Sequence, residues 1–99
     1  KKDEANYYAL IKAHLNRKKQ YPAEAKKARQ QGTVAVRFSV ERSGAVSNVS
    51  IKRSSGIDLL DQVTVELMGR VSPLPAFPAS MTENRITLTL PIEYGLTAR

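Results

Sequence analysis

The chain has 99 residues, of which 41% are hydrophobic and 25% are charged, and its formal net charge is +7. This length suits a single domain, and the composition is that of an ordinary globular protein, which excludes collagen-like and wholly disordered chains. The absence of cysteine excludes disulfides and thiolate chemistry, and no run of about 20 apolar residues is present that could cross a bilayer.

The positive charge is concentrated in the first third of the chain. Residues 1–31 hold nine Lys or Arg against three Asp or Glu, a balance of +6, whereas residues 32–99 hold seven against six, a balance of +1. This distribution favours a polyanion, an acidic protein surface or a peptidoglycan-type polymer as partner, and a lysine-rich solvated helix face explains it equally well. The first residues are polar and form no signal peptide, so we expect an excised mature domain whose anchor lies outside it.

An amphipathic helix is predicted over residues 3–19. Tyr7, Ile11, His14 and Leu15 recur at helical spacing, with acidic residues near the start and basic residues near the end, as the helix dipole favours. His14 is the only histidine and has no carboxylate at a catalytic or metal-ligand spacing, so we interpret it as part of a packing face.

A short second helix is predicted over residues 23–30. Pro22 is suited to the first position of a helix, the following residues are good helix formers, and Gly32 is expected to end the helix.

From Thr33 the hydrophobic period changes from that of a helix to two. Strands are predicted over residues 33–42 and 46–53, joined by a turn around Gly44 into an antiparallel hairpin. Val46 and Val49 are out of phase with each other, which predicts either a bulge in the second strand or a later start of that strand.

A third helix is predicted over residues 58–70, with Asp58 as its N-cap, followed by a proline-rich extended segment and a last strand over residues 85–93. The strands alternate apolar and polar residues instead of being continuously apolar. This pattern predicts an α+β domain with a three-stranded antiparallel sheet and helices packed on one face.

Little catalytic chemistry is available in this sequence. The glycines stand singly, so no loop can cradle a phosphate, and Ser54 and Ser55 have no accompanying base. We therefore expect no enzyme, no metal and no cofactor. The excess of positive charge leaves a small basic nucleic-acid-binding domain as an alternative. It is a minor alternative, because the outward strand positions carry no aromatic side chains on which bases could stack.

Pro91 indicates that the last strand lies at a sheet edge, because proline cannot donate a ladder hydrogen bond. Amide direction alternates along a strand, so the missing N–H should point away from the sheet. Thr87, Thr89 and Glu93 share this parity and should present unpaired backbone groups outward. Such an edge invites a strand from another chain, although an edge proline also serves to prevent such pairing.

An ordered set of short motifs resembles the C-terminal domain of TonB proteins from residue 8 to residue 96. The set comprises Gln20-Tyr21-Pro22, the run Gly32-Thr-Val-Ala-Val-Arg-Phe-Ser-Val, Gly44-Ala-Val, Ser54-Ser55-Gly56, Leu60-Asp61 and Pro73-Leu-Pro. The residues before Gln20 are two lysines, where the family often carries Gln-Pro, and the aromatic residues often found at Pro73-Leu-Pro are absent. The haem-uptake paralogue HasB belongs to the same family.

The resemblance implies a periplasmic binding module of a protein anchored in the Gram-negative inner membrane. It implies docking of the TonB box of an outer-membrane transporter for siderophores, haem or vitamins, beside the last strand, with force supplied by the ExbB/ExbD complex. Peptidoglycan is a further candidate partner, and no nucleic acid is expected. The related periplasmic domain of TolA-type proteins is the alternative.

The predicted partner-binding residues are those of the Tyr-Pro motif and the last strand. They are Gln20, Tyr21, Pro22, Arg85, Ile86, Thr87, Leu88, Thr89, Leu90, Pro91 and Ile92.

Overall fold

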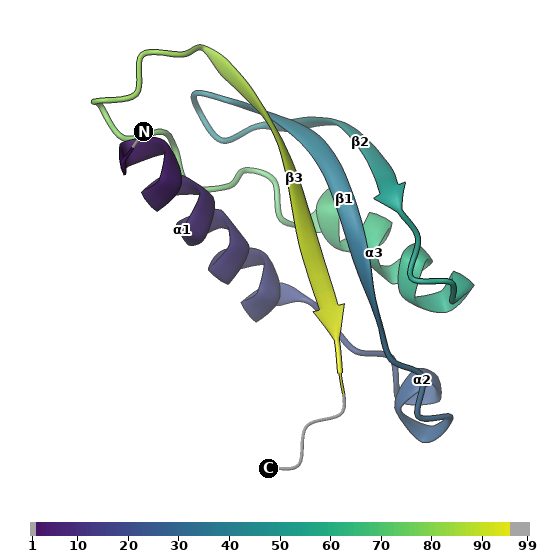
Figure 1. Cartoon of the computed structure of the whole chain (residues 1–99). Helices are drawn as coiled ribbons and strands as arrows, with labels where there is room; N and C mark the ends of the chain where they lie inside the picture. Colours follow the sequence, from purple (N-terminus) through teal and green to yellow (C-terminus); the bar gives the residue numbers. More distant parts are fainter. Residues whose placement is uncertain (1, 96–99) are drawn as a thin grey trace.

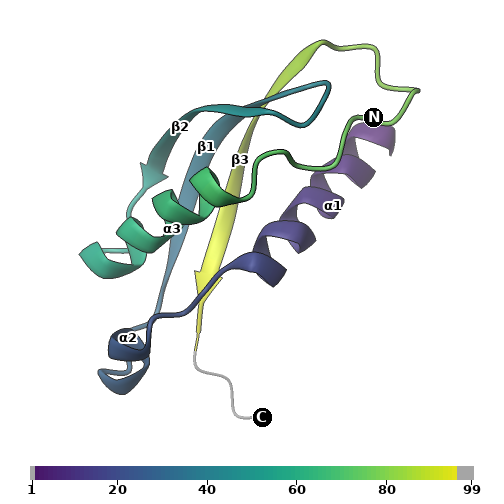
Figure 2. The same cartoon turned by 180° about the vertical axis from the view of Figure 1, so that it is seen from behind.

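A computed structural model describes residues 2–95 of the chain (Figure 1). In chain order its elements are α1 (Lys2–Lys18), α2 (Ala23–Lys27), β1 (Gly32–Glu41), β2 (Val46–Arg53), α3 (Asp58–Arg70) and β3 (Arg85–Tyr94). The strands form one antiparallel sheet, and α1 and α3 lie on the same face of it (Figure 2). The predicted α+β class and its three-stranded antiparallel sheet are therefore confirmed.

The strand order is β2-β1-β3, so β1 is central and β3 is an outer strand, as the proline argument predicted. The pairing of β1 with β3 runs without a shift through ten residue pairs, from Gly32 opposite Tyr94 to Glu41 opposite Arg85. The pairing of β1 with β2 is interrupted by two register shifts, and Asn48 has a φ of +54°. The expected bulge in the second strand is therefore present.

The core lies between the sheet and the two long helices. Tyr7, Ile11 and Leu15 of α1 are buried on one helical stripe, and α3 contributes Leu60, Leu67 and Met68. They face Val34, Val36, Phe38 and Val40 of β1 and Leu90, Ile92 and Tyr94 of β3, all of which are buried. The alternation in the strands and the helical spacing of α1 thus place their apolar faces against each other.

The segment between α3 and β3 closes one end of this core. Leu74, Phe77 and Met81 are buried in it, and the Phe77 ring packs edge-on against Tyr7 with 5.1 Å between ring centroids. The Tyr7 hydroxyl donates a hydrogen bond of 2.6 Å to the Pro75 carbonyl. The proline-rich segment thus packs against the first half of α1.

The second helix ends three residues earlier than predicted. Arg29 adopts a left-handed φ of +56°, its N–H donates to the Lys26 carbonyl, and the Gln30 N–H donates to the Ala25 carbonyl. These bonds satisfy the last carbonyls of the helix in a Schellman arrangement. Arg29 therefore ends α2, and Gly32, which was expected to do so, is the first residue of β1.

The predicted N-cap of the third helix is also wrong. Asp58 is the first residue of α3, and Ile57 holds the cap position without a side-chain cap bond. Asp61 instead accepts hydrogen bonds from the Ser55 N–H at 3.0 Å and from the Ser55 hydroxyl at 2.8 Å. The turn before the helix is thus held by a carboxylate within the helix.

Among the helices that residues 2–95 form, none combines the length and apolar character that a membrane span requires.

Candidate functional site: the outer edge of β3

The candidate site is the outer edge of β3, which within residues 2–95 pairs with β1 alone (Figure 1). Pro91 stands opposite Ala35, and because it has no N–H it occupies a position whose backbone groups face away from β1. Thr87, Thr89 and Glu93 share this parity, so their N–H and C=O groups also face outward.

Tyr8 of α1 and Lys19, the residue that follows this helix, mark this outward direction. The Tyr8 hydroxyl lies 3.4 Å from the Thr89 carbonyl oxygen, and the Lys19 ammonium donates to the Glu93 carbonyl oxygen. Thr89 and Glu93, which own these two carbonyls, are both among the residues whose backbone groups face away from β1. The edge carbonyls of β3 are therefore oriented away from the sheet, as the sequence predicts.

Lys19 is partly enclosed at the end of this edge. Burial lowers the pKa of its ammonium, and the nearby Glu93 carboxylate opposes that shift. The ammonium also lies 5.4 Å from the centroid of the Tyr94 ring, within the range of a cation–π contact. Lys19 therefore joins the end of α1 to the last two residues of β3.

The Tyr-Pro motif is held at the same end of β3. The Tyr21 ring packs edge-on against the Tyr94 ring at 5.7 Å between centroids, and its hydroxyl donates to the Gln30 carbonyl. Gln20 is exposed, whereas Tyr21 and Pro22 are half-buried. The fold thus brings residues 20–22, far away in the sequence, next to the end of the edge strand.

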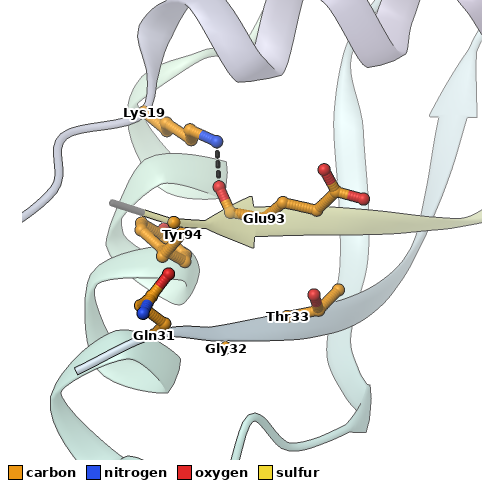
Figure 3. A pocket seen from close by; sticks show the side chains of 7 residues that line it. Lys19, Gln31, Gly32, Thr33, Glu93 and Tyr94 are labelled. Carbon is orange, nitrogen blue, oxygen red and sulfur yellow. Dashed lines mark hydrogen bonds between the residues drawn. The ribbon is translucent and has the colours of Figure 1, made fainter. Parts of the chain in front are cut away.

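A pocket of about 420 Å³ opens at this meeting point (Figure 3). It is lined by Lys19, Gln31, Gly32, Thr33, Glu93, Tyr94 and Gly95. The Lys19 ammonium and the Glu93 carbonyl meet on one side of it, and the Tyr94 ring and Gln31 lie beside them. The pocket therefore lies at the end of the β1–β3 pair, where Lys19 meets the last residues of β3.

The structure changes the set of predicted site residues in one respect. Leu90 and Ile92 are fully buried, and their parity directs their backbone groups toward β1. They have neither a side chain nor an outward amide to offer a partner, so we remove them from the proposed contact surface. Ile86 and Leu88 share the inward parity but keep half-buried side chains.

Arg85 lies at the opposite end of β3 from the Tyr-Pro motif. Its Nε donates a 2.7 Å hydrogen bond to Glu41 Oε2 in an ion pair on the solvent side of the sheet. The predicted residues therefore do not form one cluster: they extend along the full length of the strand, with residues 20–22 at its C-terminal end.

Tyr8, Lys19 and Tyr94 also belong to this site, although they were not predicted from the sequence. One signal was available, because Tyr8 and Lys19 are eleven residues apart, close to three helical turns, and so lie on one flank of a helix. What that flank would face depends on where the helix packs, which no local pattern indicates.

The titratable side chains of residues 2–95 are scattered and form no cluster suited to a metal ion. Across residues 2–95, no group of three or more His, Cys, Asp or Glu is placed to hold a metal ion. His14 is half-buried, and burial together with the positive charges of Lys18 and Arg17 lowers its pKa. The outer edge of β3 itself presents outward backbone N–H and C=O groups, bordered by the half-buried side chains of Ile86 and Leu88.

Comparison with known proteins shows similarity over most of the chain. Residues 17–96 match the family model described as Gram-negative bacterial TonB protein C-terminal. The chain is 29% identical over 96 residues to protein TonB of Pasteurella multocida, covering 96% of this chain and 36% of that protein. It is 34% identical over 90 residues to protein TonB of Haemophilus influenzae, covering 87% of this chain and 33% of that protein. The chain therefore spans about a third of the length of these relatives.

Solved structures have the same architecture. The C-terminal domain of Helicobacter pylori TonB, residues 179–285, superposes with a TM-score of 0.78 at 24% identity and covers 95% of this chain and 84% of that one. The C-terminal domain of HasB superposes with a TM-score of 0.59 at 38% identity, covering 94% of this chain and 72% of that one. At 24% identity, the similarity to the Helicobacter pylori domain shows a shared fold only.

Proposed function

Because this chain belongs to the Gram-negative TonB C-terminal family, we propose that it docks an extended segment of an outer-membrane transporter onto the edge of β3. The segment is the TonB box at the transporter's N-terminus, and it adds as a further strand beside β3. Main-chain hydrogen bonds then supply affinity, and side-chain fit at alternate positions supplies selectivity.

One observation carries this proposal: the only neighbour of β3 within residues 2–95 is β1, and the pairing is regular over ten residues. A regular strand presents its outward groups at even spacing, which is what an added strand needs. The other outer strand, β2, is a poorer template, because its register shifts and the left-handed Asn48 distort it. The two edges of the sheet are therefore not equivalent, and β3 is the better docking edge.

The proposed contacts follow from the parity of β3. Arg85, Thr87 and Thr89 offer outward N–H and C=O groups, and Pro91 offers a carbonyl. The half-buried side chains of Ile86 and Leu88 border this row, and Gln20, Tyr21 and Pro22 meet the partner at its far end.

The wider role is proposed from the family. The domain is the periplasmic end of a protein anchored in the inner membrane, and it transmits force from the ExbB/ExbD complex to the transporter. The cargo is a siderophore, haem or a vitamin, and the domain itself performs binding, not catalysis. The excess of positive charge in residues 1–31 guides it toward an acidic periplasmic surface of the transporter or toward peptidoglycan, in a salt-sensitive manner.

The test is a titration of the ¹⁵N-labelled chain with a synthetic TonB-box peptide. We expect the largest amide shifts at Thr87, Thr89 and residues 20–21, with new protection of the outward amides from hydrogen exchange. A peptide with the same composition in scrambled order serves as the control. Shifts that cluster on β2, or on the polar face of the sheet away from β3, would show that the edge assignment is wrong.

A further inference from the structure

The edge of β3 has an open half and a half that α1 already occupies. Within residues 2–95, no hydrogen bond is made to the outward N–H or C=O of Thr87. Further along the strand, Tyr8 contacts the Thr89 carbonyl and Lys19 contacts the Glu93 carbonyl. Because Pro91 between them has no N–H, a partner strand meets a full set of free groups only at the beginning of β3.

We propose that Tyr8 and Lys19 are releasable caps on the docking edge, and that a strand docking along Thr89–Glu93 must displace both. This inference rests on the proposed function, since it concerns how that edge is regulated. An N–H of the docking strand and the capping side chain, Tyr8 or Lys19, compete for the same carbonyl oxygen. Docking then begins at Arg85–Thr87 and extends along the strand as the caps release.

The caps can leave without moving the helix that carries them. The stripe of Tyr7, Ile11 and Leu15 is buried in the core and holds α1 in place. Tyr8 is half-buried, and its contact at 3.4 Å is long for a hydroxyl hydrogen bond, so it is easily exchanged. Lys19 has a flexible four-carbon stem whose ammonium is readily accommodated by water.

Caps of this kind are also of use to the free domain. An outer strand with unpaired groups is a template for pairing with a second copy of the same chain. Side chains that contact the carbonyls of β3 reduce this pairing between copies. They are displaced only by a partner that binds along the whole strand. Tyr8 lies before residues 17–96, which match the family model, so this cap comes from a part of α1 outside that match.

The first measurement needs no variant. In the 99-residue chain labelled with ¹³C and ¹⁵N, the carbonyl resonances of Thr89 and Glu93 are followed through the amides of Leu90 and Tyr94. Saturation with the TonB-box peptide should shift both carbonyl resonances. It should also shift the side-chain resonances of Tyr8 and Lys19, because their contacts with these carbonyls are lost. Unchanged carbonyl and side-chain signals in a chain that binds the peptide would overturn the inference and leave the docking proposal intact.

The second measurement compares affinities. Tyr8→Phe keeps the ring and Lys19→Met keeps most of the stem, so the double variant removes the two caps with little change in packing. We expect it to bind the peptide roughly threefold to tenfold more tightly than the wild type, which corresponds to about 0.7–1.4 kcal/mol. Lys18→Met is the matched control, because it removes the same charge from an exposed neighbour that, within residues 2–95, makes no hydrogen bond or ion pair with β3.

The remaining outcomes are also decisive. If the double variant binds no more tightly than Lys18→Met, the caps do not compete with docking and the inference fails, while the proposed function stands. If neither the wild type nor the double variant binds the peptide, the proposed function itself fails and the release of the caps fails with it. Tight binding by the double variant alone would support both.

Discussion

The hydroxyl of Tyr94, at the end of β3, lies 2.8 Å from the hydroxyl of Thr64 in α3, and both side chains are buried. The Thr64 hydroxyl also donates at 2.8 Å to the Leu60 carbonyl one turn earlier in the helix. Since Thr64 has a single hydroxyl proton, Tyr94 is the donor in their shared bond. This bond fixes the end of β3 to α3, and with it the ring against which Tyr21 packs.

The direction of that bond predicts an asymmetry between two conservative substitutions. Thr64→Val leaves the Tyr94 hydroxyl buried without an acceptor and should lower the free energy of unfolding by about 1–3 kcal/mol. Tyr94→Phe leaves Thr64 bonded to Leu60 and should cost less, about 0.5–1.5 kcal/mol. Urea denaturation of both variants and the double variant measures the coupling. Equal losses in the two single variants would contradict the assigned donor.

Thr89→Pro tests the outward parity of β3. It removes one outward N–H and spares the bonds to β1, so we expect a loss of about 0.5–1.5 kcal/mol in peptide binding with the chain still folded. The matched control is Leu90→Pro, which removes an N–H that faces β1 and should unfold the strand. Calorimetric titration and thermal denaturation measure the two effects. A chain that fails to fold with proline at position 89 would place that amide within the sheet ladder.

Phe38→Ala tests the assigned core face of β1. Phe38 is fully buried opposite Leu88, so the cavity should lower the free energy of unfolding by about 3–5 kcal/mol. The neighbouring Arg37→Ala changes an exposed residue on the other face and should stay within about 0.5 kcal/mol. Denaturant unfolding of the two variants gives the comparison. A cost well below about 1 kcal/mol at position 38 would mean that the two faces are reversed.

His14 predicts part of the pH dependence of stability. Burial and the charges of Lys18 and Arg17 lower its pKa below the ordinary value of 6.5, so the unfolded chain binds this proton more tightly. The contribution of neutral His14 to the free energy of unfolding is therefore complete above pH 6.5. It is lost as the pH falls through 6.5 toward the lower pKa that His14 has in the folded state. The free energy of unfolding should fall between pH 7.5 and pH 5, and less steeply in His14→Gln. An identical slope in the two chains would show that His14 does not contribute.

Much of the fold follows from local periodicity and from a few special residues. The change of apolar period from helical to two at Thr33 determined where helices end and strands begin, because each period places one face toward a core. Pro91 alone identified β3 as an outer strand, because a residue without an N–H cannot sit between two strands. The family resemblance, carried by short motifs at turns and strand starts, is confirmed by the match to residues 17–96.

Tertiary structure decided which elements meet, because pairing and packing partners are distant in sequence and no local pattern encodes them. It made β1 the central strand, buried Leu90 and Ile92, and set Tyr21 against Tyr94. It also laid one flank of α1 along β3, so that Tyr8 and Lys19 reach carbonyls 81 and 74 residues away. Pro91 alone was thus enough to predict that β3 lies at an edge of the sheet. The contacts of Tyr8 and Lys19 with that edge depend on where α1 packs, which the sequence does not indicate.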